Sequence, residues 1–125
     1  GPQLETLEII IRITLVLHLL GFATIFGGVL AQTKNFKTGA PVSPGILHGS
    51  WLALITGLIL TGLVYANGEV VNNLALSLKG LGITAIFFIA YTFAKRETAP
   101  KWVVPTIGLL TVLNVVFAVV LGVVA

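Results

Sequence analysis

Four long apolar segments, almost free of charged residues, decide what this chain can fold into. They cover 13–32, 46–66, 74–94 and 103–125, and each is close to the roughly 20 residues that a helix needs to cross the hydrocarbon core of a bilayer. Charged residues make up 9% of the chain and hydrophobic residues 57%, whereas about a quarter of the residues of a soluble domain are charged. The pattern predicts an all-α fold, an integral membrane four-helix bundle. It excludes a soluble enzyme, a nucleic-acid-binding protein and a disordered tail.

Helix-breaking residues between the segments set the expected helix ends. The Gly- and Pro-rich cluster over 38–45 contains Pro44, which suits the first turn of a helix, and Pro105 falls in or near the first turn of the last one. The opening dipeptide Gly1-Pro2 is typical of the remnant left when an expression tag is cleaved, so it is set aside. We expect one domain over 3–125, with helices over about 4–32, 44–66, 72–95 and 102–125.

The distribution of cations predicts the orientation in the membrane. Loops 33–45 and 95–102 carry five Lys or Arg side chains, whereas the opposite side carries two, Arg12 and Lys79. The positive-inside tendency then places both loops in the cytoplasm and both termini outside, in a multi-pass protein of the cell membrane. The net charge of +3 therefore reflects topology rather than an affinity for nucleic acid.

Two ionisable side chains inside the predicted spans are candidate functional residues, because such groups are costly in a membrane. Lys79 lies roughly 7 Å below the start of the third segment. It either snorkels to the interface or faces inward along a stripe of small residues and contacts a solute. His18 lies about 9 Å from the outer edge. It either donates a hydrogen bond to a Thr or a carbonyl across a helix seam, or serves as a haem or metal ligand, a proton relay or a solute contact.

Three further polar residues complete the candidate set. Asn114 lies at the midpoint of the fourth segment, where burying a polar side chain costs free energy unless the side chain forms a hydrogen bond. We therefore expect it to join two helices or to contact a solute or ion. Gln32 ends the polar stripe of the first helix and is another candidate solute contact. His48, at the start of the second helix, is either interfacial, near a lipid headgroup, or a metal or haem ligand.

The two histidines are poor candidates for joint ligation of one haem. Their expected depths differ by some 17 Å across a core of roughly 30 Å, whereas two imidazole nitrogens on one iron lie about 4 Å apart. Ligation by His18 alone stays open. The cofactor is therefore unknown: haem b or a metal is compatible with the histidines, but a thiolate site is excluded because the chain has no Cys.

Small residues on the helices predict close packing, since they let helices approach in a bilayer. The faces left over after four helices have packed predict a homo-oligomer, or a subunit of a membrane complex. The predicted packing residues are Gly21, Gly27, Gly28, Gly57, Gly82 and Gly108.

The run His18-Leu-Leu-Gly21-Phe-Ala-Thr-Ile-Phe-Gly27-Gly28, followed by His48-Gly49, resembles the His-then-Gly helices of CopD-like copper-resistance membrane domains and of related uncharacterised bacterial four-helix membrane proteins. The resemblance covers the first helix and the start of the second, and it implies copper handling or haem association. The chain has neither Met nor Cys, the soft ligands that suit Cu(I), which argues against copper.

Two functions follow from these observations. The first is a transport or permeation module, or a membrane-embedded subunit, without enzymatic chemistry, because the sequence has no Asp, no HExxH motif and no phosphate-binding loop. The alternative is a haem- or metal-binding membrane protein that uses His18, with or without His48.

Overall fold

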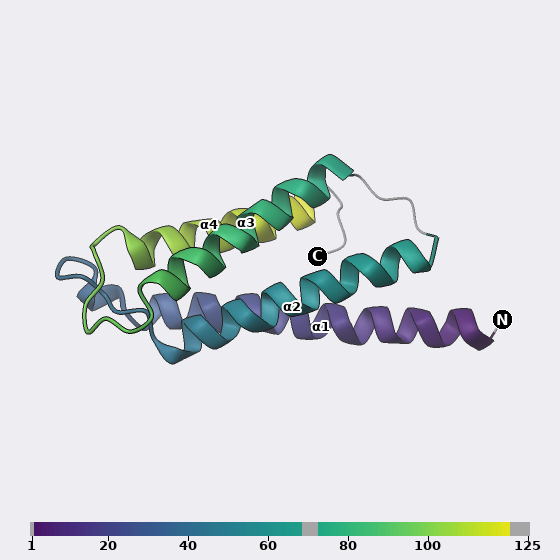
Figure 1. Ribbon diagram of the computed structural model, residues 1–125, viewed down its shortest axis with the longest axis horizontal. Helices are drawn as coiled ribbons and strands as arrows, with labels where there is room; N and C mark the ends of the chain where they lie inside the picture. The colour runs from purple at the N-terminus through teal and green to yellow at the C-terminus, as the bar shows by residue number, and fades with distance from the viewer. Residues whose placement is uncertain (1, 69–72, 121–125) are drawn as a thin grey trace.

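The computed structural model describes residues 2–68 and 73–120, and over these residues the fold is all-helical. Its four α-helices are α1 (Pro2–Leu30), α2 (Pro44–Ala66), α3 (Asn73–Thr92) and α4 (Val103–Val120), with a short 3-10 turn, η1 (Thr33–Asn35), after α1. Figure 1 shows α1 lying along α2 and α3 lying beside α4, with the α1–α2 and α3–α4 loops at the same end of the bundle. The expected all-α, four-helix architecture is confirmed for the described residues.

Local sequence explains where α2 and α4 begin. Pro44 is the first residue of α2, and the Ser43 side chain caps the helix by accepting a hydrogen bond from the backbone N–H of Ile46 at 3.3 Å. Pro105 lies in the first turn of α4, where a missing N–H costs little. The starting points indicated by the two prolines are therefore the ones observed.

The ends of α1 and α3 differ from the expectation. α1 begins at Pro2, so a residue set aside as a tag remnant is the first residue of the helix. α3 ends at Thr92 rather than near residue 95 because the chain tightens into turns: the Ala94 N–H donates to the carbonyl of Tyr91, three residues back.

Three of the described helices have the length and apolarity of membrane spans. These segments are Glu5–Leu30, Pro44–Ala66 and Val103–Val120. The apolar part of α3, Leu76–Thr92, is shorter than 18 residues and lies at the lower end of the range for a transmembrane helix.

The buried side chains form two apolar clusters. The larger cluster joins all four helices at the loop end and includes Ile25, Ile46, Ile86 and Ile107, each fully buried. The smaller cluster joins α1 to α2 near their other ends, around Ile11, Leu60 and Val64. Most of the buried polar side chains lie between these two clusters, which is where the candidate site is found.

Glycines permit the closest helix approaches. A Cβ added to Gly21 would lie 2.7 Å from the backbone nitrogen of Ala53, and one added to Gly49 would lie 2.8 Å from the carbonyl oxygen of Gly21. Backbone atoms of α1 and α2 therefore nearly touch at this crossing. Gly49 was not among the predicted packing residues.

The other predicted packing glycines divide into two groups. Four of them contact a facing helix, so a Cβ would meet a side chain: Gly28 meets Ile46, Gly57 meets His18, Gly82 meets Asn114 and Gly108 meets Val29. Gly27 differs, because a Cβ there has no atom within 4 Å. Its helix face points away from the bundle, so it does not pack against another described helix of this chain.

The two loops at the common end touch each other. Gly39, in the α1–α2 loop, has a φ of 98°, a left-handed conformation that favours glycine. A Cβ at this position would also collide with the carbonyl oxygen of Ala99 in the α3–α4 loop. The two loops are therefore in close contact at the end of the bundle where the larger cluster lies.

Candidate functional site

Polar side chains from all four helices are buried in one layer between the two apolar clusters. His18 comes from α1, Thr56 from α2, Lys79 from α3 and Asn114 from α4, and none of the four is more than 6% exposed. The sequence singled out three of them separately as solute-contact candidates. The fold brings those three to the walls of one cavity.

His18 is fixed at one edge by α2. Its Nδ1 lies 2.9 Å from the Thr56 hydroxyl oxygen, and Phe22, one turn further along α1, packs its ring edge-on against the imidazole at 4.9 Å. The Thr56 hydroxyl has a single proton, which it donates to the carbonyl oxygen of Leu52 at 2.5 Å. We infer that the threonine oxygen accepts from Nδ1–H, so Nε2 carries a lone pair.

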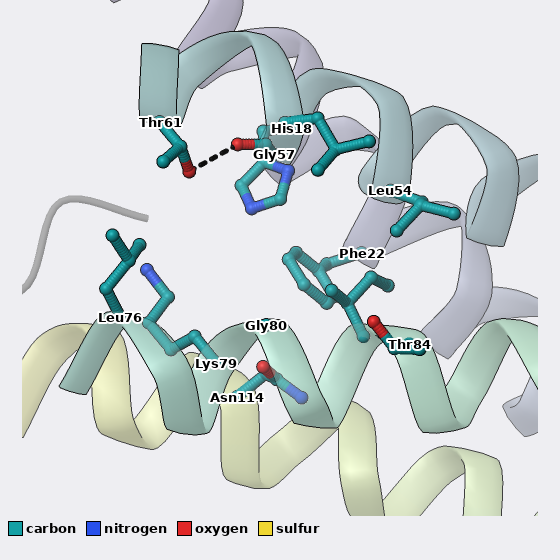
Figure 2. A pocket seen from close by; sticks show the side chains of 12 residues that line it. His18, Phe22, Leu54, Gly57, Thr61, Leu76, Lys79, Gly80, Thr84 and Asn114 are labelled. Carbon is teal, nitrogen blue, oxygen red and sulfur yellow. Dashed lines mark hydrogen bonds between the residues drawn. The ribbon is translucent and has the colours of Figure 1, made fainter. Parts of the chain in front are cut away.

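The expected hydrogen bond across a helix seam is therefore formed, but it occupies only one ring nitrogen. Figure 2 shows the His18 ring projecting into the space between the α1–α2 pair and α3. A neutral imidazole held in this way presents a hydrogen-bond acceptor to the cavity.

A change at Thr56 tests this tautomer. We expect ¹⁵N spectra of the imidazole to show an unprotonated Nε2 in the wild-type protein and in Thr56→Ser, which retains the hydroxyl. Thr56→Val leaves Nδ1–H without its acceptor, so the second tautomer should gain population and stability should fall by about 1–3 kcal/mol. Identical spectra for the serine and valine variants would show that Thr56 does not select the tautomer.

Lys79 faces the interior. Its side chain is 6% exposed and extends from α3 toward α2, with the amine on the side of Thr61 and His18 (Figure 2). This burial favours the inward-facing alternative over the one in which Lys79 snorkels to the interface. The reason is the inner face of α3, where Lys79 is in register with Gly82, Ile86 and Ala90, and the latter two are fully buried.

Asn114 is held in a single orientation with one of its polar atoms unpaired. Its Nδ2 donates to the Leu110 carbonyl oxygen of its own helix at 2.9 Å, and the amide packs against Gly82 of α3. Its Oδ1 is buried without a hydrogen-bond partner. The expected pairing between two helices is a packing contact here, and the hydrogen bond stays within α4.

The cavity has a volume of about 240 Å³, slightly below the range of about 300–1,000 Å³ typical of drug-sized ligands. Its deep wall is buried and formed by His18, Phe22, Lys79, Ile83 and Asn114. Its rim lies on α2 and α3, and its remaining lining residues are Leu54, Gly57, Leu58, Thr61, Leu76, Gly80 and Thr84. Three of the five residues of the deep wall are thus polar, whereas the rim is largely apolar.

The remaining candidates lie elsewhere. Gln32 is in the loop end, where its side-chain oxygen accepts a hydrogen bond from Asn35 at 2.9 Å, and His48 is exposed in the first turns of α2. Because His18 is level with Gly57, the two histidines are separated by about 13 Å along α2. Within the described residues, no group of three His, Cys, Asp or Glu side chains is placed to hold a metal ion.

Sequence reasoning missed Thr56 and Thr61. Each hydroxyl donates to a carbonyl four residues back in α2, Thr61 to Gly57 at 2.8 Å, as threonines in apolar helices commonly do. Their position in the site depends on the rotation of α2 against α1. Thr61 lies one turn from Gly57 on the same face of α2, and both residues line the cavity.

No protein-family model, curated protein or solved structure matches this chain. The resemblance to CopD-like domains therefore stays a prediction, and function rests on the geometry of the cavity.

Proposed function

We propose that this chain is a four-span integral protein of the cell membrane that binds a small solute in the cavity lined by His18, Lys79 and Asn114. It would work as a transport or permeation module, or as a membrane-embedded subunit, without enzymatic chemistry. The observation that carries this proposal is the meeting of three polar side chains, from three different helices, around a single cavity. Burying such groups in an apolar bundle is costly, and a bound solute accounts for it.

The distribution of polarity supports a bilayer as the surroundings. Large apolar side chains face outward on every helix, among them Leu20, Leu58, Leu81 and Leu109, each at least half exposed. Buried polar groups lie inside. An apolar exterior of this extent is unfavourable in water and favourable in lipid.

A ligand screen tests the binding function. Purified protein in detergent would be unfolded with SDS in the presence of a panel of small carboxylates, polyols and lipophilic alcohols. A ligand at about 100 times its Kd should raise the free energy of unfolding by about 2.7 kcal/mol. His18→Ala and Lys79→Gln should lose this gain, whereas Gly62→Ala, on an open face of α2, should keep it. A panel without any stabilising compound would overturn the proposal.

A second candidate function is binding of haem or a metal ion through His18. The observation that favours it is the tie from Nδ1 to Thr56, because metal-ligating histidines are usually oriented by a hydrogen bond at the other nitrogen. The Lys79 amine on the same cavity opposes a cation there. A Soret band or stoichiometric metal, lost in His18→Ala, would establish this function, and a colourless, metal-free preparation would eliminate it.

The proposed orientation predicts a labelling pattern. The chain has no Cys, so single cysteines report without background. We expect a membrane-impermeant maleimide to label Thr6→Cys but not Lys37→Cys in intact cells, and to label both after lysis. The reversed pattern would place the loops outside.

The proposed oligomer makes a prediction at Gly27. Ala23 and Gly27 on α1, together with Ala31 directly after its end, form an exposed ridge of small residues. Because a Cβ at Gly27 meets open space, Gly27→Leu should leave the free energy of unfolding within about 0.5 kcal/mol of wild type while shifting migration in mild detergent to a smaller species. Unchanged migration would count against this ridge as an oligomer contact.

A further inference from the structure

We propose that the solute is a membrane-dissolved amphiphile with a hydroxyl head, such as an alcohol or a phenol, and an apolar body. In this proposal the molecule reaches the cavity sideways, between α2 and α3. The inference rests on the proposed binding function and specifies the chemistry and the route of its ligand.

The first requirement on the ligand comes from Asn114. This side chain is 4% exposed, and its Oδ1 is buried without a partner. The amide cannot usefully rotate, because its Nδ2 is engaged by the Leu110 carbonyl, and exchanging the two atoms would set one oxygen against the other. A buried acceptor left unpaired costs about 1–3 kcal/mol, so the ligand is expected to bring a donor to it.

The second requirement comes from the groups opposite. The Lys79 amine supplies hydrogen-bond donors, and its three hydrogens allow it to bind a ligand oxygen in addition to its other interactions. His18 Nε2 is an acceptor, as inferred from the Thr56 contact. A ligand hydroxyl can donate its one proton to Asn114 Oδ1 while its oxygen accepts from the Lys79 amine, so one small group meets both of these requirements.

The charge of the lining narrows the head group further. None of the residues lining the cavity in the described part of the chain is acidic. An ammonium head would therefore lie near the like charge of Lys79. A neutral hydroxyl head avoids this repulsion.

The rim indicates the route. Leu58, Gly80 and Thr84 are exposed, and they lie on the flanks of α2 and α3 rather than beyond their ends. A Cβ added to Gly80 meets no atom within 4 Å, so there is open space beside α3 at this point of the rim. With apolar leucines on both sides, Leu54 and Leu58 on α2 and Leu76 on α3, the opening suits an apolar body that arrives from lipid.

A matched pair of probes tests both parts of the proposal. 4-Butylphenol has a hydroxyl donor, whereas its methyl ether, 4-butylanisole, retains the oxygen but cannot donate. Each would be titrated into the full chain in phosphatidylcholine nanodiscs, with the backbone amide signal of Gly82 as the NMR readout. We expect the phenol to bind about tenfold more tightly than the ether.

Three variants separate the contributions. Asn114→Leu should reduce the preference for the phenol to less than about twofold, because the orphan acceptor is gone. Gly80→Leu fills the opening and should weaken both probes about tenfold or more. Gly62→Leu makes the same change on an open face outside the lining, and should leave both affinities within about twofold.

The outcomes distinguish this inference from the function on which it rests. Equal affinities for phenol and ether would overturn the hydroxyl requirement, and an unaffected Gly80→Leu would overturn lateral access. If glycerol shifts the Gly82 signal and the phenol does not, the cavity binds a solute from water, so the inference fails while the proposed function stands. If no probe and no member of the solute panel binds, both fail.

Discussion

Replacing Gly49 by valine is expected to prevent stable folding of the bundle. The added Cβ would lie 2.8 Å from the carbonyl oxygen of Gly21 and 2.9 Å from the backbone nitrogen of Ile25. Backbone atoms cannot turn aside as a side chain can, so α1 and α2 must separate along their contact, the most extensive between any two helices of the described chain. Overpacking typically costs 1–3 kcal/mol and occasionally more, and we expect a loss of at least about 3 kcal/mol here.

Unfolding in mixed SDS micelles, followed by circular dichroism, measures this loss. Gly62→Val is the matched control, because it makes the same change in the same helix where a Cβ meets no atom within 4 Å. The effect of valine on helix propensity is then common to both variants. Equal stability of the two variants would mean that α1 and α2 do not cross at Gly21 and Gly49.

Replacing Asn114 by leucine is expected to raise stability while weakening ligand binding. Leucine removes the unpaired Oδ1 at similar size, so the free energy of unfolding should increase by about 1–2 kcal/mol. A functional group that costs stability is a common trade-off at binding sites. Any ligand found in the screen should lose at least about tenfold in affinity.

Thr111→Val is the control for this second prediction. Thr111 is buried on the same face of α4, but its hydroxyl already donates to the Ile107 carbonyl at 2.8 Å. Its removal should therefore bring no gain in stability. If Asn114→Leu is less stable than wild type, Oδ1 has a partner in the folded protein, and the assignment of this atom to a ligand is wrong.

Sequence periodicity predicted much of what faces inward. The predicted residues His18 and Gly21 are buried on α1, and Gly108 and Asn114 are buried on α4. Helical geometry alone places such residues on one side, and small or polar residues favour contact with another helix in a membrane. The inner faces were therefore predictable before any packing was known.

The assembly of the cavity was not predictable in this way. The sequence left two positions for the Lys79 side chain, at the interface or facing inward. Which of them is lower in energy depends on the helix that packs against this face of α3. Thr56 carries no distinguishing signal in the sequence, and its contact with His18 depends on the rotation and axial offset of α2 against α1. For a single helix, the sequence predicts the depth of each residue along the helix and the helix face on which it lies. A site formed by four helices also depends on how these helices are rotated and offset against one another.

The contact between Gly39 and Ala99 has a mechanical consequence. It brings the two loops together at one end, whereas α1 and α2 make the most extensive contact between any two described helices, and every contact of α3 or α4 with that pair is smaller. His18 lies about 18 Å along α1 from its loop end at Leu30. A small tilt of α3 and α4 about the joined loops would produce a larger displacement at that distance, altering the spacing between His18 and Lys79 while the contact between α1 and α2 stays intact.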